Sequence, residues 1–200
     1  VVAFVDPDMM SSMPKGLTAA TGMDALTHAI EGYITAGAWE LSDMFHIKSI
    51  EIIARSLRAA VENTPEGRAD MALGQYVAGM GFSNVGLGIV HSMAHKTGAA
   101  YSGGHIVHGC ANAMYLPKVI RFNAVEPEAQ KRYANIARFL HLEGSTDAEL
   151  VDALIAHIQN MNKQLDIPTC IKDYEGGIID EKEFMEKLPT VAELAVGDAC

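Results

Sequence analysis

Apolar residues recur at helical spacing over most of this 200-residue chain. In the stretch 47–61, isoleucine, alanine, leucine and valine return every three or four positions, which places them on one face of an amphipathic helix. Such a helix must bury its apolar face against another element, and several of them in succession predict a helical bundle. The pattern therefore favours an all-α fold.

Two further helices are expected in the first half of the chain. Thr21, with Asp24 three residues later, predicts a helix that begins near residue 21 and reaches about residue 35. Residues 70–82 are apolar nearly all round, so we expect a buried helix there. Its glycines (Gly74, Gly79 and Gly81) would allow neighbouring backbones to approach closely.

Three more helices are expected in the second half. Residues 108–121 predict a helix that contains Pro117, which should kink it. The sequence Thr146-Asp-Ala-Glu149 is a capping box, and the apolar residues that follow it lie on one helical face. Asp180 is expected to begin the last helix.

The two ends of the sequence predict that it is part of a longer protein. Residues 1–5, Val-Val-Ala-Phe-Val, have the composition of a buried strand and precede a turn at Asp6-Pro-Asp8. We expect residues 1–14 to link an absent domain to a helical domain over residues 15–200. The last helical pattern stops at Cys200 without a terminating signal, so we expect this domain to continue further.

Composition excludes some classes of partner and leaves others open. The chain has 15 Lys and Arg against 25 Asp and Glu, a net charge of −10, which argues against binding nucleic acid or an anionic membrane. Three widely spaced cysteines without a CxxC pair fit a reducing compartment. Because we find neither a signal peptide nor a long apolar run, we expect a soluble, cytoplasmic protein.

Histidines are concentrated in one short stretch. Four of them lie within eighteen residues, as the pairs His91 and His95, and His105 and His108. On a helix, spacings of four or three residues put both side chains of a pair on one face. Far upstream, Asp24 and His28 have the same spacing of four. Helices that bring these clusters together would form a metal site.

The candidate ligands are Asp24, His28, His91 and one of His105 or His108. One anionic oxygen and three neutral nitrogens suit Fe²⁺ or Zn²⁺ and are poor ligands for Ca²⁺ or Mg²⁺. Four protein ligands would leave room for a substrate oxygen, as a catalytic site requires.

Other interpretations were weighed against this metal site. A lone histidine on a helix is usually a packing or surface residue, and we assign His46, His141 and His157 to such roles. The stretch 91–95 has the two-histidine spacing of a zincin protease but lacks the glutamate that follows the first histidine. No Gly-rich phosphate loop and no Ser-His-Asp or Cys-His arrangement stands out from chance.

Several stretches resemble the iron-containing (group III) alcohol dehydrogenases. Residues 8–10, 19–35 and 71–88 are similar to that family. His91-Ser-Met-Ala-His95 and His108-Gly-Cys-Ala-Asn-Ala113 resemble the family's second signature, in the right order and separation. The resemblance covers nearly the whole chain.

The resemblance implies a two-domain enzyme, of which this chain is one part. In the family, an N-terminal Rossmann-like domain binds the nicotinamide cofactor, NAD or NADP, and a helical domain of the dehydroquinate synthase-like type holds the metal. This sequence resembles only the helical domain, so the cofactor would be bound mainly outside it. The implied metal ligands are Asp24, His28, His91 and a fourth histidine.

The identity of the fourth ligand depends on how the sequence is matched to the family. The family's usual spacing lands on His105, whereas its His-Gly-x-Ala-Asn-Ala motif lands on His108. We favour His108 because extra residues in the Gly-rich loop around residues 102–104 cost little, while the following helix fixes the register. His105 stays the alternative.

The function implied by the resemblance is hydride transfer between a nicotinamide and a small alcohol or aldehyde, of the lactaldehyde or 1,2-propanediol kind. The metal would act as a Lewis acid on the substrate oxygen. His95 would relay a proton or orient substrate and nicotinamide, or else only pack beside the site. Glu31 would fix an imidazole tautomer, or else be an exposed helix charge.

The alternatives keep the helical fold and change its role. A glycerol- or butanol-type dehydrogenase of the same family is one. A non-catalytic helical module for metal binding or dimerisation is another. For the enzyme, we expect a homodimer.

Overall fold

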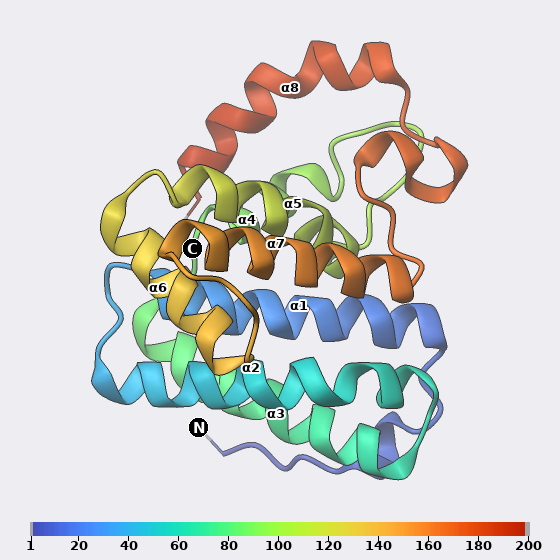
Figure 1. Ribbon diagram of the computed structural model, residues 1–200. Coiled ribbons are helices and arrows are strands. Elements are labelled where there is room, and N and C mark those ends of the chain that lie inside the picture. The colour runs from blue at the N-terminus through green and yellow to red at the C-terminus, as the bar shows by residue number, and fades with distance from the viewer. Residues whose placement is uncertain (1, 199–200) are drawn as a thin grey trace.

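A computed structural model describes residues 2–198 and is helical throughout, with no strand among these residues (Figure 1). None of the described helices has the length and apolar composition that crossing a bilayer requires. The elements in chain order are η1 (Pro7–Met10), α1 (Lys15–Ile34), α2 (Glu40–Val61), α3 (Pro65–Val85), α4 (Ile89–Thr97), α5 (His108–Asn123), α6 (Pro127–Phe139), α7 (Asp147–Gln164), η2 (Ile171–Gly176) and α8 (Glu181–Val196).

Helix α1 is the centre of the bundle. It packs against α2, α3, α5 and α6, and Figure 1 shows it running across the middle of the molecule. Its apolar side chains Met23, Leu26 and Ile30 are completely buried in the main core. A residue on α1 is therefore within reach of several helices that lie far away in sequence.

The prediction that the first helix begins near Thr21 is wrong. Helix α1 begins at Lys15, directly after Pro14, and Thr21 lies inside it. The Thr21 hydroxyl donates to the Leu17 carbonyl oxygen at 2.8 Å. A threonine side chain can bond the carbonyl one turn earlier as well as cap a helix, so its presence does not by itself mark a start.

The prediction of a fully buried third helix is also wrong. In α3, the side chains of Leu73, Tyr76 and Met80 are 49%, 38% and 40% exposed. The helix packs against α1, α2 and η1, and these three side chains meet solvent in spite of the apolar composition of the helix. Periodicity alone did not distinguish its buried positions from its exposed ones.

Two of the three glycines of α3 lie at close contacts, and the third does not. A Cβ added at Gly81 would lie 2.3 Å from Nε2 of His46, and one at Gly74 would lie 2.9 Å from an isoleucine of α2. A Cβ at Gly79 would have no neighbour within 4 Å, so the expectation of a close approach there is wrong. His46 is completely buried, in agreement with a packing role.

The prediction of a strand at the start of the chain is not met. Residues 2–6 form no regular element, and the Phe4 side chain is 97% exposed. A strand needs a partner to receive its backbone hydrogen bonds, and the described residues offer none. Val1 of the expected strand, like Cys200 at the other end, lies outside the described residues.

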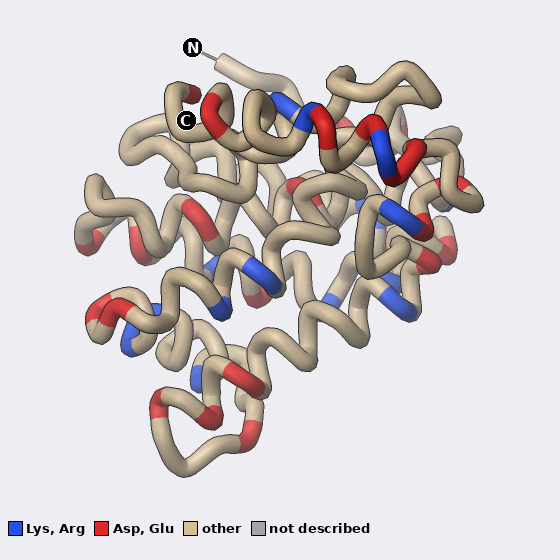
Figure 2. The backbone as a smooth tube through the Cα atoms, turned by 90° about the horizontal axis from the view of Figure 1, so that it is seen from above, with Lys and Arg blue, Asp and Glu red and all other residues tan. Residues whose placement is uncertain are grey.

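Helices with local start signals form as predicted. Thr146 and Glu149 make the reciprocal bonds of a capping box at the start of α7, and Asp180 caps α8 by accepting from the Glu183 backbone N–H. Helix α6, which begins at Pro127 after a Glu126 cap, was not among the predicted helices. Figure 2 shows acidic and basic residues interspersed along the described backbone, so the net charge is spread over many elements.

Candidate metal centre

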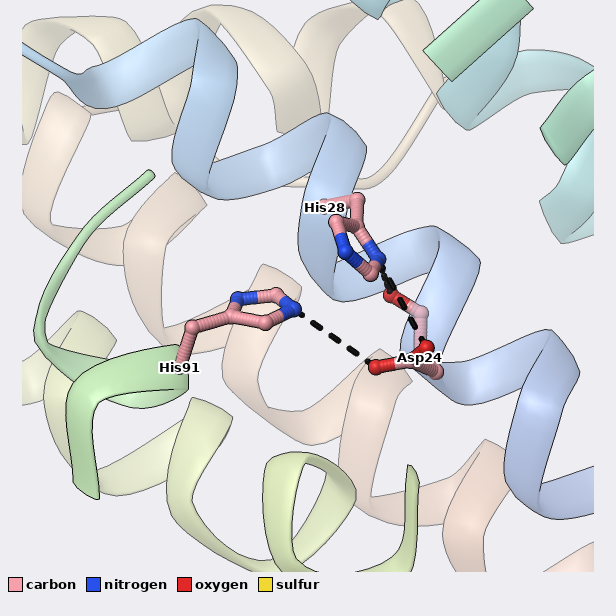
Figure 3. A group of neighbouring side chains, drawn as sticks. All are labelled: Asp24, His28 and His91. Carbon is pink, nitrogen blue, oxygen red and sulfur yellow. Dashed lines mark hydrogen bonds and ion pairs between the residues drawn. The ribbon is translucent and has the colours of Figure 1, made fainter. Parts of the chain in front are cut away.

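Asp24, His28 and His91 form a compact group between α1 and α4. Their candidate ligand atoms all lie within 4.8 Å of one another. Asp24 and His28 are one turn apart on α1, and His91 lies in the first turn of α4 (Figure 3). The two clusters that are distant in sequence therefore meet in the structure.

The Asp24 carboxylate lies between the two imidazoles. Its Oδ1 is 3.5 Å from Nε2 of His91, and its Oδ2 is 3.7 Å from Nδ1 of His28. Nδ1 of His28 is also 2.8 Å from the Asp24 carbonyl oxygen. Because a carbonyl oxygen only accepts, Nδ1 of His28 must carry the hydrogen, which leaves the lone pair on Nε2.

His91 presents a buried nitrogen without a hydrogen-bond partner. The side chain is 1% exposed, and its Nε2 has no partner among the described residues. Its other nitrogen, Nδ1, is 2.6 Å from Oε2 of Glu31. A buried polar atom without a partner is costly. An electron-pair acceptor beside Asp24 would satisfy it, so the residues present fit a divalent cation.

Glu31 is the third residue of α1, after Asp24 and His28, whose polar side chain belongs to this region. It is only 5% exposed, so the interpretation of Glu31 as an exposed helix charge is wrong. Its carboxylate accepts from the backbone N–H of Val90 at 2.7 Å and from that of His91 at 3.2 Å, in addition to the His91 ring. It lies at the N-terminus of α4, where backbone N–H groups lack helical partners and favour an anion.

His108, the first residue of α5, lies beside this group. Its Nε2 is 3.3 Å from Oδ1 of Asp24, and its ring is half-exposed and 5.5 Å from the ring of His91. It is not one of the three residues whose ligand atoms all lie within 4.8 Å of one another. His105 is exposed on the loop between α4 and α5 and is not in the group either. Of the two alternatives, the structure brings His108 closer to Asp24.

Two side chains of α8 form hydrogen bonds with the loop that carries His105. Glu183 of α8 accepts from the Ser102 backbone N–H at 3.0 Å and from its hydroxyl at 2.8 Å. Lys187, one turn later, donates to the Ala100 carbonyl oxygen at 2.6 Å. The insertion expected around residues 102–104 is therefore an anchored loop.

His95 lies at the exposed edge of the cluster. It is one turn after His91 on α4, and its ring stacks on that of His108 at 5.1 Å with an interplanar angle of 14°. Its Nδ1 is 3.4 Å from Oδ2 of Asp198, which also pairs with Lys96. His95 is therefore a partly exposed member of this group of histidines, in contact with the His108 ring and the Asp198 carboxylate.

The cluster holds one anionic oxygen among imidazoles. Burial raises the pKa of Asp24, but the neighbouring histidines, His91 first, outweigh it and hold that pKa below its usual value. Burial lowers the pKa of His28 and that of His108. Burial also lowers the pKa of His91, but the nearby carboxylates of Asp24 and Glu31 raise it more, so its pKa lies above the usual value. The arrangement places one carboxylate among three imidazoles, two of which have a lowered pKa, and such oxygen and nitrogen donors can bind a cation.

Two residues that support the cluster were missed by the sequence analysis. Asn112 donates from Nδ2 to Oδ1 of Asp24 at 2.6 Å, and the same nitrogen is 3.1 Å from Nε2 of His108. Its spacing of four from His108 on α5 is a signal that could have found it. Gly88 lies against Glu31, and a Cβ there would be 2.7 Å from Oε1. No local pattern indicates that contact.

A cavity of about 480 Å³ opens beside Asp24 and His28. Residues from η1, α1, α2, α3 and the segment between η1 and α1 line it, among them Met10, Met13 and Phe82. Its volume is within the range of small-molecule sites, and its lining combines apolar side chains with a few polar ones. The cluster can therefore meet a small organic molecule as well as a cation.

An all-helical fold that brings a carboxylate and histidines together beside a small cavity has the features of a candidate metal-binding domain. Residues 18–200 match the sequence model of the Fe-containing alcohol dehydrogenase family, C-terminal. The chain belongs to this family.

Relatives in sequence and in structure agree with that assignment. The chain is 49% identical to a lactaldehyde reductase of Escherichia coli, in a match that covers 100% of this chain and 50% of that protein. It is 48% identical to an NADPH-dependent butanol dehydrogenase of Clostridium saccharobutylicum, in a match that covers 100% of this chain and 49% of that protein. A crystal structure of a 1,3-propanediol oxidoreductase matches with a TM-score of 0.86 at 37% identity, over 97% of this chain and 49% of that one. An iron-containing alcohol dehydrogenase from Thermococcus thioreducens matches with a TM-score of 0.85 at 33% identity, over 98% and 48%. The chain thus spans about half the length of these relatives.

Proposed function

We propose that this chain is the helical, metal-binding part of an NAD(P)-dependent alcohol dehydrogenase that interconverts a small alcohol and its aldehyde. The observation that carries the proposal is the buried, unpartnered Nε2 of His91, which faces the Asp24 carboxylate beside a cavity. Because the relatives are about twice as long, the activity is proposed for the whole protein, with a nucleotide-binding domain that precedes residues 1–14.

Asp24, His28, His91 and His108 would hold the metal, Fe²⁺ or Zn²⁺. When bound, either ion supplies Lewis-acid chemistry, polarising the oxygen of the alcohol or aldehyde. Asp24 offsets part of the ionic charge, and His28 offers Nε2 because its Nδ1 is committed to a backbone carbonyl. His108, at the start of α5, is the favoured fourth ligand because His105 is exposed on the loop.

The cavity is large enough to admit a substrate of a few carbon atoms. Met10, Met13 and Phe82 would exclude water from one side of the substrate. Asp24 and His28 would provide polar groups on the other side. The relatives named for butanol and lactaldehyde support this size of substrate. His95, at the exposed edge, would exchange a proton with solvent or orient the substrate and nicotinamide.

The proposal is tested on the whole protein. After loading with Fe²⁺ or Zn²⁺, it should oxidise NADH or NADPH in the presence of lactaldehyde or butanal, and the 200-residue chain alone should give no turnover. A whole protein that retains metal but reduces neither aldehyde with either cofactor would identify a non-catalytic metal-binding module.

A further inference from the structure

We propose that Glu31 is a positioning residue of the metal centre, which fixes His91 in the tautomer that leaves the Nε2 lone pair facing Asp24. The inference rests on the proposed function of the cluster. It concerns a residue that contacts a ligand histidine rather than the substrate.

Both carboxylate oxygens of Glu31 act as acceptors. Oε1 accepts from the Val90 backbone N–H at 2.7 Å, and Oε2 accepts from the His91 backbone N–H at 3.2 Å. Oε2 also lies 2.6 Å from Nδ1 of His91. Both oxygens already accept from backbone N–H groups, so this third contact also fits an acceptor oxygen, and the hydrogen in it belongs to Nδ1 of His91. The lone pair of the ring is then on Nε2.

The position of Glu31 on α1 links it to the two ligands of that helix. Asp24, His28 and Glu31 are separated by four and three residues, so they share one face of α1. The first two point into the cluster, and the third reaches the N-terminus of α4. One face of one helix thereby supplies two candidate ligands and the anchor of a third.

The geometry around Glu31 leaves its side chain little freedom. A Cβ at Gly88 would lie 2.7 Å from Oε1, so the absence of a side chain there makes room for the carboxylate. Glu31 is buried, and its two backbone contacts hold the first turn of α4, which carries His91. The same carboxylate therefore sets both the place of the His91 backbone and the orientation of its ring.

The tautomer decides what His91 can do. With the hydrogen on Nδ1, Nε2 can donate its lone pair to a cation. With the hydrogen on Nε2, the ring would instead donate a hydrogen bond to Oδ1 of Asp24, 3.5 Å away, and would not be a ligand. Carboxylates behind ligand histidines typically change metal affinity by about 10- to 100-fold when they are removed.

The first experiment measures the tautomer directly. In the chain labelled with ¹⁵N on histidine and freed of metal, the neutral His91 ring should show a protonated Nδ1 and an unprotonated Nε2. This measurement needs no variant, so it decides even if a variant fails to fold. A protonated Nε2 in the wild-type chain would overturn the proposal.

The second experiment replaces Glu31 by glutamine. In Glu31→Gln, the amide oxygen can accept from Val90, and the amide N–H₂ then faces Nδ1 of His91, which must accept. We expect the ring hydrogen to move to Nε2 and the affinity for Zn²⁺, measured by competition with a chelator, to fall about 10- to 100-fold. Glu62→Gln, at an exposed ion pair with Arg58, is the control and should bind Zn²⁺ like the wild type.

The outcomes separate this inference from the proposed function. A Glu31→Gln chain with unchanged tautomer overturns the inference, whether or not its Zn²⁺ affinity falls, because any loss would then come from the fold of α4. The inference is also overturned if the His91 tautomer changes in Glu31→Gln while the affinity for Zn²⁺ stays that of the wild type. A wild-type chain that binds no Zn²⁺ contradicts the metal centre itself, and the tautomer in that chain still reports on Glu31.

Discussion

Gly32 of α1 and Gly81 of α3 both lie against the imidazole of His46. A Cβ added at either glycine would lie 2.3 Å from Nε2 of that ring. Both ring nitrogens of His46 lack a hydrogen-bond partner among the described residues, and the side chain is completely buried. The His46 ring, which α2 carries, thus fills a space that is open because α1 and α3 have glycine at positions 32 and 81.

Replacing Gly81 by alanine should destabilise the fold by about 1–3 kcal/mol, because the added methyl group overlaps a rigid buried ring. Gly79, on the same helix, has open space around it, so Gly79→Ala is a matched control. It should stabilise the helix by up to about 1 kcal/mol, since alanine is the better helix former. Urea unfolding of the two variants checks the prediction, and equal stabilities would contradict it.

The stability of the fold should depend on the protonation of His46. Burial is the main cause that lowers its pKa from 6.5 to about 4. The Asp43 charge raises this pKa by a smaller amount, and the Arg132 charge lowers it further. Between these pH values the unfolded chain binds a proton that the folded chain does not, so the free energy of unfolding should decrease as the pH falls from about 6.5 to about 4. The full loss is on the order of 3 kcal/mol.

His46→Leu isolates this contribution, because wild type and variant share all other titrating groups. Denaturant unfolding at several pH values between 7 and 4 should give a flatter pH profile for the variant than for the wild type. Parallel profiles would show that His46 takes up its proton in the folded state as readily as in the unfolded state.

Replacing Asp24 by asparagine should abolish metal retention, because it removes the anionic oxygen that lies between His91 and His108 and keeps the shape of the side chain. Elemental analysis of the purified chain after loading with Fe²⁺ or Zn²⁺ measures this. Circular dichroism should show an unchanged helix content. A stoichiometry equal to that of the wild type would exclude Asp24 as a ligand.

Single replacements of His105 and His108 by alanine should identify the fourth ligand. We expect His108→Ala to lose metal or bind it weakly, because its Nε2 is 3.3 Å from Oδ1 of Asp24. His105→Ala should keep metal, because His105 is exposed on the loop. The reverse result would show that the loop rearranges around the ion and that His105 is the ligand.

Local signals predicted helices well, and contacts between helices did not follow from them. The capping box at Thr146 and the cap at Asp180 depend only on neighbours in the chain, so the starts of α7 and α8 could be predicted. The exposed side of α3 depends on which helices it meets, and the strand expected at residues 1–5 depends on a partner that the described chain does not contain. Neither can be deduced from a short window of sequence.

The same division applies to the candidate metal centre. The spacing of Asp24 and His28 is a local property of α1, and it marked them as a pair. The spacing of the histidines led to the hypothesis that His91 and one of His105 or His108 approach this pair, and the resemblance to a family then favoured His108. The roles of Gly88 and Asn112 depend on how α1, α4 and α5 pack together, so they became visible only in three dimensions.

The anchoring of residues 100–102 by Glu183 and Lys187 connects two regions that the sequence keeps far apart. A relative with a shorter loop between α4 and α5 would leave those two charged side chains without their carbonyl and hydroxyl partners. Length changes in this loop and substitutions in the first half of α8 should therefore occur together among homologous proteins. The C-terminal helix, which supplies no member of the cluster, would in this way constrain how the family can vary its fourth ligand.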